Sequence, residues 1–178
     1  MKLIRSIWLA PLVLGVALAG CGDDEEDPNL DPATPTADDT LCESLDGSAR
    51  VTATAAPASA QFDPTATLPE LDVDATAYTL TLPAAEMGGT GFEGFVEIIV
   101  SEDSTYAVAL GSSVTLTVIP RPMGPPTPSV ATETVDNPCT AVVSRSNFDL
   151  LASASQGVHY FQIQSDTAEV DISVLKLD

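Results

Sequence analysis

Short runs in which apolar and polar residues alternate set the strongest limit on the fold of this chain. The runs 78–82, 114–118 and 170–174 each place an apolar side chain at every second position, with threonine, serine or aspartate between. Side chains of a strand point to opposite faces with a period of two, so this pattern predicts strands with one buried and one solvated face. After residue 20, no window keeps a helical period for three turns. We therefore expect a chain built from strands.

Further segments with strand composition occur between these runs, and glycine, proline or Asp/Ser pairs separate nearly all of them. These segments are Ala49–Ala55, Phe95–Ser101, Thr105–Leu110, Ser129–Val135, Thr140–Ser144 and Gly157–Gln164. The spacing leaves no room for helical crossovers between parallel strands. It predicts an all-β fold, an antiparallel β-sandwich of jelly-roll or immunoglobulin-like type with about eight to nine strands.

Two stretches interrupt the strand pattern. Residues 56–74 are rich in alanine, proline and aspartate and are expected to form a long surface loop. Residues 120–128 carry repeated prolines, which cannot donate to a central ladder, so we expect a stiff connection between the sheets. The alternative for this stretch is a ligand for a proline-recognition domain.

The first residues have the order of an export signal. Lys2 and Arg5 precede an apolar run from Ile7 to Ala19, which is too short to span a bilayer comfortably. The run ends in Leu18-Ala19-Gly20-Cys21, which resembles the lipobox of bacterial lipoproteins. This resemblance implies cleavage between Gly20 and Cys21, and a thioether-linked diacylglyceryl group on the Cys21 thiol. It also implies a lipid-anchored protein of the bacterial cell envelope, expected in the outer membrane on its periplasmic face or at the cell surface.

The composition then changes twice along the chain. Residues 1–20 are the expected signal peptide, and residues 21–41 the expected lipidated cysteine with an acidic, disordered tether. The tether has almost no apolar side chains with which to offset the entropy of ordering. Its acidic run 23–27 lacks the spacing and turn glycine of a calcium loop. Residues 42–178 are the expected β-sandwich domain.

The chain is strongly acidic, and this charge excludes one class of partner. It carries 26 acidic and 6 basic side chains, for a net charge of −20. Loss of residues 1–20 removes Lys2 and Arg5 but no acid, which leaves −22. Nucleic acid would be repelled. The expected partners are the lipid bilayer, through acylated Cys21, and an envelope protein or a polysaccharide.

Two cysteines remain once Cys21 is assigned to lipid. An exported protein matures in an oxidising compartment, so a disulfide between Cys42 and Cys139 is the expected state. The alternative is a reactive or metal-binding thiol pair. No CxxC spacing supports it, and the chain has one histidine.

Candidates for chemistry are few. His159, the single histidine, shares strand parity with Phe161 and Ile163 and is expected in the core. The segment 89–94 matches G-x-G-x-x-G, but a β-rich run follows it instead of a helix, so we interpret it as a hairpin or loop. Asp72 and Asp74 are candidates for calcium binding or glycoside chemistry. We expect no catalytic residue, no metal site and no cofactor.

A second resemblance concerns the last strands. The stretch from Phe148 to Leu151, then 157–163 and 170–174, resembles the final strands of jelly-roll accessory domains found beside secreted bacterial peptidases. This resemblance implies the sandwich and assigns no functional residue.

Three classes of function follow. We expect a membrane-anchored, non-catalytic envelope lipoprotein whose β-sandwich has a structural or protein-binding role. The first alternative is a carbohydrate- or calcium-binding module, although Trp8 is the only tryptophan and is lost with the signal. The second alternative is a secreted hydrolase that uses His159.

Overall fold

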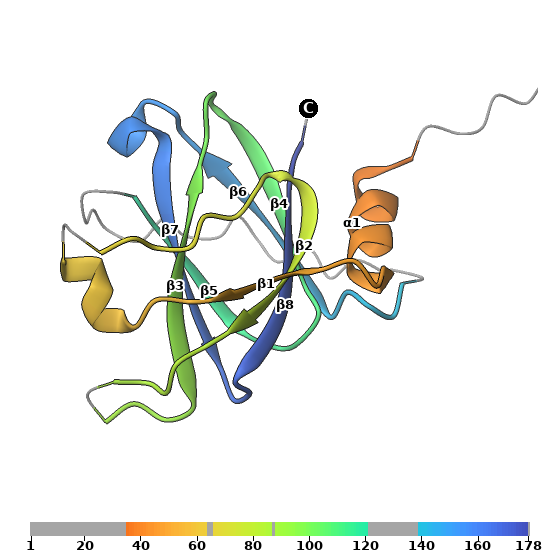
Figure 1. Cartoon of the computed structure of the whole chain (residues 1–178). Helices are drawn as coiled ribbons and strands as arrows, with labels where there is room; N and C mark the ends of the chain where they lie inside the picture. The colour runs from red at the N-terminus through yellow and green to blue at the C-terminus, as the bar shows by residue number, and fades with distance from the viewer. Residues whose placement is uncertain (1–34, 64–65, 87, 121–138, 178) are drawn as a thin grey trace, which may run out of the picture. The chain divides into compact units, whose positions relative to one another are not determined.

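Two β-sheets face each other in the part of the chain that the computed structural model describes, residues 35–63, 66–86, 88–120 and 139–177 (Figure 1). One sheet has five strands in the order β1-β2-β8-β4-β6, and the other has three in the order β3-β7-β5. The bounds in chain order are β1 (Val51–Thr54), β2 (Asp74–Thr81), β3 (Phe92–Ile99), β4 (Ser104–Leu110), β5 (Thr115–Pro120), β6 (Ser144–Leu150), β7 (Val158–Ser165) and β8 (Glu169–Lys176). The predicted all-β sandwich is confirmed.

The strand pairs are antiparallel with one exception. The edge strand β1 runs parallel to β2, with Val51 opposite Tyr78 and Thr54 opposite Thr81. The strand β5 is an edge of the smaller sheet and pairs with β7. Its last residue, Pro120, is tolerated there because an edge strand leaves one row of backbone groups outside the ladder.

The main core lies between the two sheets, and the alternating runs supply it. Leu80, Val108 and Ile172 point inward from the larger sheet, and Phe161 and Ile163 from the smaller one; all five are buried. Across the interface, the rings of Phe148 and Phe161 have centroids 5.8 Å apart in a tilted arrangement. Burial of these side chains is the main favourable term for the fold.

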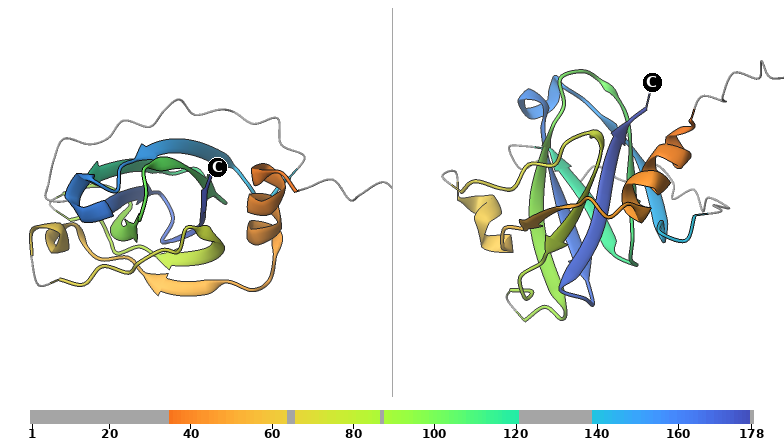
Figure 2. Two further views of the ribbon diagram at one scale, coloured as in Figure 1. Left: turned by 90° about the horizontal axis from the view of Figure 1, so that it is seen from above. Right: turned by 45° about the vertical axis from the view of Figure 1, so that its right-hand side comes forward.

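The helix α1 (Ala37–Asp46) covers the outer face of the five-stranded sheet (Figures 1 and 2). Its buried Leu41 and Leu45 are four residues apart and therefore lie on one face of the helix. They pack on Ala77, Ala107 and Ala109. Small side chains on the sheet let the helix come close enough to bury both leucines.

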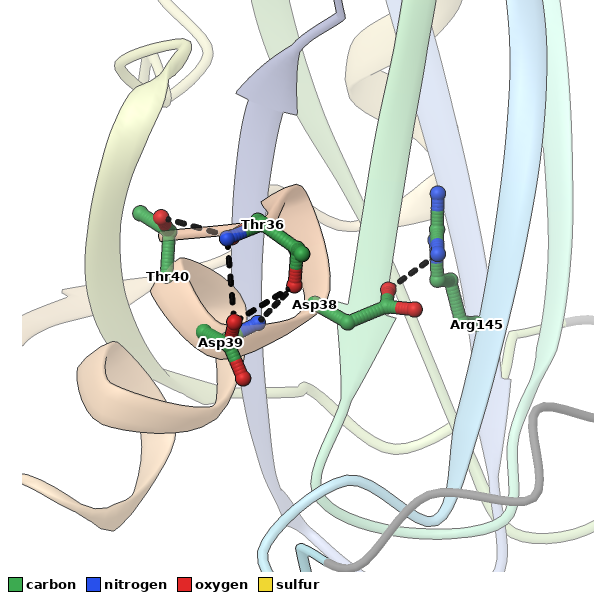
Figure 3. Close-up of polar contacts among 5 residues, drawn as sticks. All are labelled: Thr36, Asp38, Asp39, Thr40 and Arg145. Carbon is green, nitrogen blue, oxygen red and sulfur yellow. Dashed lines mark hydrogen bonds and ion pairs between the residues drawn. The ribbon is translucent and has the colours of Figure 1, made fainter. Parts of the chain in front are cut away.

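The start of α1 is closed by a capping box (Figure 3). The Thr36 hydroxyl oxygen accepts a hydrogen bond from the Asp39 amide at 3.2 Å, and the Asp39 carboxylate accepts one from the Thr36 amide at 3.0 Å. These bonds satisfy donors that a helix start leaves open. The Thr36 hydroxyl also donates to the Asp39 carboxylate at 2.7 Å, and this bond, together with the one from the Thr36 amide, lowers the pKa of Asp39. One residue earlier, Asp38 forms an ion pair with Arg145 on β6.

The structure corrects the expected domain boundary. Residues 37–41, assigned to the disordered tether, belong to α1, so the folded unit begins before residue 42. Two features of the sequence indicate this helix: the capping pair Thr36 and Asp39, and the four-residue spacing of Leu41 and Leu45. Both lie in or next to the acidic stretch that was interpreted as a tether. The helix has 10 residues, which is fewer than three turns. The rest of the expected tether, residues 21–34, lies outside the described residues.

Two expected strands differ from the structure or lie outside it. A strand was expected at 140–144, but residues 140–143 are not in a strand, and β6 begins at Ser144. Its polar residues Arg145 and Asn147 weaken the alternation, and pairing with β4 establishes the strand. The expected strand at 129–135 and the proline-rich stretch beyond Pro120 lie outside the described residues.

The expected loop at 56–74 has a more specific role. After β1, Ala56 makes an isolated bridge to Phe95. A short 3-10 helix, η1 (Ala58–Phe62), follows, and Glu70 then makes an isolated bridge to Glu97. This segment therefore lies against the three-stranded sheet, on the side of the sandwich opposite α1 (Figure 2). The loop expectation also ended too late, because β2 begins at Asp74.

Candidate binding site

The outer face of the three-stranded sheet changes character along its strands. On the central strand β7, Phe161 and Ile163 point into the core, and Tyr160, Gln162 and Gln164 point the other way. The outward residues are aromatic at one end of the strand and amides at the other. The aromatic end therefore favours packing against apolar side chains, and the amide end favours polar groups or solvent.

The aromatic end is covered by the chain itself. Phe95 and Tyr160 are buried together with Leu68, which belongs to the segment after η1, and Ile119 of β5 packs against them. The bridges from Ala56 to Phe95, before η1, and from Glu70 to Glu97, after it, hold both ends of this stretch against β3. This half of the outer face is a small second core.

The amide end carries a straight row of polar residues across all three strands. Glu93 on β3 is opposite Gln164 on β7, and Gln164 is in turn opposite Thr115 on β5. Gln164 and Thr115 are exposed, and Glu93 is partly buried. Polar groups of three separate segments thus form one surface.

Hydrogen bonds hold the centre of this row. The Glu93 Oε1 atom accepts one bond from the Gln164 amide at 3.0 Å and another from the Gln162 amide. The second carboxylate oxygen, Oε2, makes no hydrogen bond to another described residue. The two glutamines therefore orient the carboxylate and leave an acceptor for an incoming group.

A pocket of about 420 Å³ lies at this end of the sheet. Its polar lining comes from Thr90, Glu93, Ser113, Thr115, Gln164, Ser165 and Asp166. Its apolar lining is Ala85, Phe92 and Val114. These residues come from the loop before β3 and the start of β3, from the start of β5 and the residues before it, and from the end of β7 and the turn after it. Tertiary structure therefore assembles the pocket.

The glycine-rich segment forms one wall of this pocket, as a loop running into β3, in agreement with its interpretation as a hairpin or loop. Gly91 has a φ of +80°, and a Cβ placed there would lie 2.5 Å from the Ser165 carbonyl oxygen. A Cβ at Gly94 would lie 2.5 Å from the Ala55 Cβ. These glycines permit close backbone approach, which explains them without a nucleotide.

The pocket is lined by acids and has no basic side chain among its described lining residues. Basic residues of the described chain lie elsewhere, in ion pairs of Arg50 with Asp171, Arg145 with Asp38, and Lys176 with Glu102. The pocket therefore has a negative potential, which disfavours anionic ligands.

His159 lies in the interior, as its parity predicted. It is 3% exposed, and its Nε2 atom is 3.1 Å from the Leu151 carbonyl oxygen, which places the ring proton on Nε2. Its Nδ1 atom has no hydrogen-bond partner among the described residues. Burial lowers the pKa of His159. A neutral ring bonded to a carbonyl group, with no serine or aspartate partner, does not support the arrangement of a hydrolase triad.

The carboxylates of Asp72 and Asp74 serve local structure. The Tyr78 hydroxyl donates to Asp72 at 2.7 Å, and the Thr76 hydroxyl donates to Asp74 at 2.7 Å. Within the described ranges, no group of three or more ligating side chains forms a metal site. The two aspartates thus bind different partners and do not converge on one point.

The structure brings together the two cysteines that were expected to pair. Cys42 on α1 and Cys139, which precedes β6, line the same small pocket of about 210 Å³, together with Thr140. No disulfide is found among the described residues, so the bond itself stays a prediction. The arrangement places a potential covalent link between α1 and the sandwich.

The expected lipidation and cleavage residues, Gly20 and Cys21, lie outside the described residues, as does the whole expected signal peptide. In the described part of the chain, no helix has the length and apolar character needed to cross a membrane. The sequence matches no protein-family model and no curated protein.

Sequence reasoning missed the main candidates, Glu93, Gln164 and Thr115. Two partial signals were present. Gln162 and Gln164 alternate with Phe161 and Ile163, which marks the outer face of one strand. The glycines at 89 and 91 mark a tight approach of backbone. Neither signal says which strands are neighbours, and the row exists only because β7 lies between β3 and β5.

Proposed function

We propose that this chain is a lipid-anchored, non-catalytic binding protein of the bacterial cell envelope, whose β-sandwich has a structural or protein-binding role. The anchor rests on the resemblance of Leu18-Ala19-Gly20-Cys21 to a lipobox. Two or more acyl chains give stable membrane attachment, whereas one gives marginal attachment.

One structural observation carries the binding role. The tether is followed by α1, which covers the outer face of the larger sheet, whereas the polar row of Glu93, Gln164 and Thr115 lies on the outer face of the smaller sheet. The two lie on opposite sides of the sandwich (Figure 2). The helix that follows the tether therefore leaves the polar face accessible.

The arrangement of ionisable groups supports binding over catalysis. A hydrolase that works near neutral pH needs a group able to move a proton, and histidine is the usual one. His159 is buried and bonded to a backbone carbonyl, and its pKa is lowered by burial. The pocket carboxylates Glu93 and Asp166 come from β3 and the turn after β7. This site has acceptors and hydroxyls but no imidazole.

Labelling tests the anchor. Cells grown with labelled palmitate should incorporate label into the wild-type chain and the Cys42→Ser variant, but not into Cys21→Ser, because serine cannot form the thioether. The Cys42→Ser variant is the matched control, since it also loses one thiol. Equal label on Cys21→Ser would overturn the lipoprotein assignment.

A site-specific crosslink tests the binding role. A photo-crosslinking residue at Thr115 in intact cells should give a discrete adduct, and the same residue at exposed Thr52 on β1 should not. Absence of any adduct specific to Thr115 would argue against a partner on this face. Turnover of ester, peptide or glycoside substrates that His159→Gln abolishes at unchanged melting temperature would refute the non-catalytic assignment.

A further inference from the structure

We propose that the pocket beside Glu93, Gln164 and Thr115 binds a short segment of a neutral saccharide. This inference rests on the proposed function, since it names the ligand class of the same exposed polar face. The starting observation is that, among the described residues, the apolar half of this face is covered and the polar half borders a pocket. The polar half has hydrogen-bonding groups that the fold does not use.

The unused groups match the hydrogen-bonding character of sugar hydroxyls. The side chains of Thr90, Ser113 and Thr115 make no hydrogen bond to another described residue, and each hydroxyl both donates and accepts. The Gln164 side-chain amide donates one of its two N–H groups to Glu93 and keeps its carbonyl oxygen as an acceptor for a ligand. Sugar hydroxyls also donate and accept, so they can form hydrogen bonds with these pocket groups in both directions.

The orientation of Glu93 favours a hydroxyl donor. Two amide groups, from Gln162 and Gln164, already bond to its Oε1 atom, and this fixes the plane of the carboxylate before a ligand arrives. A hydrogen bond to the remaining oxygen is charge-assisted and therefore stronger than a neutral one. Preorganised groups bind more tightly because less freedom is lost on association.

The charge of the pocket restricts the saccharide. Glu93 and Asp166 line it, and none of its described lining residues is basic. A uronic acid or phosphorylated sugar would therefore place its own anion near two carboxylates. A neutral saccharide avoids this repulsion, and its hydroxyls still reach the carboxylate oxygens.

The apolar part of the lining suits a ring with a hydrocarbon face. Phe92, at the start of β3, and Val114, directly before β5, are partly buried, and Ala85 lies on the loop before β3. Phe92 also packs against the main core, so it adds only the exposed part of one aromatic side chain to the lining. Ligand sites commonly combine a few placed polar groups with such apolar contact.

A basic peptide is the alternative occupant, and the lining favours it less. An ammonium group donates only, so it would leave the donor capacity of the three hydroxyls unused. In addition, part of the charge of Glu93 is already satisfied by two amide donors. A saccharide uses both donors and acceptors of the pocket, whereas a basic peptide uses acceptors only. One binding experiment with both kinds of probe therefore distinguishes the two ligands.

The test uses the purified full chain, labelled with ¹⁵N, in micelles of a detergent without a sugar head group. The probes are maltotriose, cellotriose, mannotriose and tri-N-acetylchitotriose, with trigalacturonate as the acidic probe and trilysine as the basic one. At least one neutral probe should shift the amide signals of Gly91, Thr115 and Gln164 with saturation. Trigalacturonate should not.

Two variants and one control complete the test. Glu93→Gln should weaken binding of that neutral probe by about tenfold or more, because it removes a charged acceptor but keeps the side-chain shape. Thr115→Val, at an exposed site on an edge strand, should weaken binding without disturbing the fold. Glu169→Gln changes an exposed acid outside the pocket and should leave binding unchanged.

The proposal is overturned if no neutral probe shifts these signals, if trilysine or trigalacturonate binds more tightly than every neutral probe, or if Glu169→Gln and Glu93→Gln have equal effects. Failure here is distinguishable from failure of the proposed function. If palmitate labelling still depends on Cys21 and the crosslink at Thr115 still forms, the anchored binding protein stands and the saccharide is wrong.

Discussion

The Nε2 atom of His159 lies 3.1 Å from the carbonyl oxygen of Leu151, and this contact joins β7 to the segment that follows β6. The ring is 3% exposed, and its cross-strand neighbours Ile98 and Pro120 carry no charge. Protonation would place a charge on buried Nδ1, which has no hydrogen-bond partner among the described residues. Burial therefore lowers the pKa of His159.

The first prediction is a pH dependence of stability. Because the folded-state pKa of His159 lies below the unfolded value of about 6.5, the unfolded chain binds the proton more readily. The contribution of His159 to the free energy of unfolding is thus fully present above about pH 6.5 and is lost as the pH falls below it. Each unit of pKa difference corresponds to about 1.4 kcal/mol.

The measurement is urea denaturation of the wild type and His159→Gln between about pH 5.5 and 7.5, a range in which carboxylates contribute little. Glutamine keeps an N–H donor for Leu151 but does not titrate. The wild type should lose more stability than the variant on acidification. Parallel curves for the two proteins would contradict the assignment.

The second prediction concerns Cys42 and Cys139, which line one small pocket. We expect a disulfide to form after the proposed export of the chain. Closure of a loop of nearly 100 residues would stabilise the fold by up to about 4.7 kcal/mol in the chain-entropy model. Reduction should therefore lower the melting temperature of the wild type but not that of Cys42→Ser. Non-reducing peptide mapping that recovers both thiols alkylated under denaturing conditions would show that the bond does not form.

The third prediction concerns the helix start shown in Figure 3. Thr36→Ala removes the side-chain acceptor of the capping box and should destabilise the domain by about 1 kcal/mol. Thr40→Ala is the control on the same helix, because its hydroxyl donates to the Thr36 carbonyl oxygen and caps nothing. Thermal unfolding should show a larger loss for Thr36→Ala. Equal losses would mean that α1 is held by packing alone.

The fourth prediction compares two glycines of the loop before β3. Gly88 and Gly91 both have positive φ, but a Cβ at Gly88 meets no atom within 4 Å, whereas one at Gly91 would lie 2.5 Å from the Ser165 carbonyl oxygen. Gly88→Ala should cost about 1 to 2 kcal/mol for the backbone conformation alone. Gly91→Ala should cost more and should shift the signals of Ser165 and Asp166 in the pocket. Equal destabilisation would argue against the close approach.

Local patterns were sufficient to find most strands. Alternating apolar and polar residues in 78–82 and 170–174 predicted β2 and β8. Successive side chains of a strand point to opposite faces, so a strand with one buried face has this alternation. The pattern failed at β6, where Arg145 and Asn147 occupy the outer face and hide the alternation. It also failed at α1, since two buried leucines are too few to show a helical period.

The candidate site could not be predicted in the same way. Glu93, Gln164 and Thr115 are far apart in the sequence, and each is an ordinary polar residue in its own strand. Their alignment depends on the strand order β3-β7-β5 and on the register of both pairs. Likewise, nothing near Leu68 indicates that it would cover Phe95 and Tyr160.

The sequence by itself determined that this chain is strand-rich and strongly acidic, with one histidine on a buried face and a lipobox-like start. These properties depend on composition and on neighbours a few residues apart. Only the tertiary structure decided that α1 docks on the larger sheet, that Cys42 and Cys139 line one pocket, and that a polar pocket lies at one end of the smaller sheet. The physical reason is that these contacts join segments that are distant in the sequence. Strand order and register determine which segments meet, and no local pattern encodes either of them.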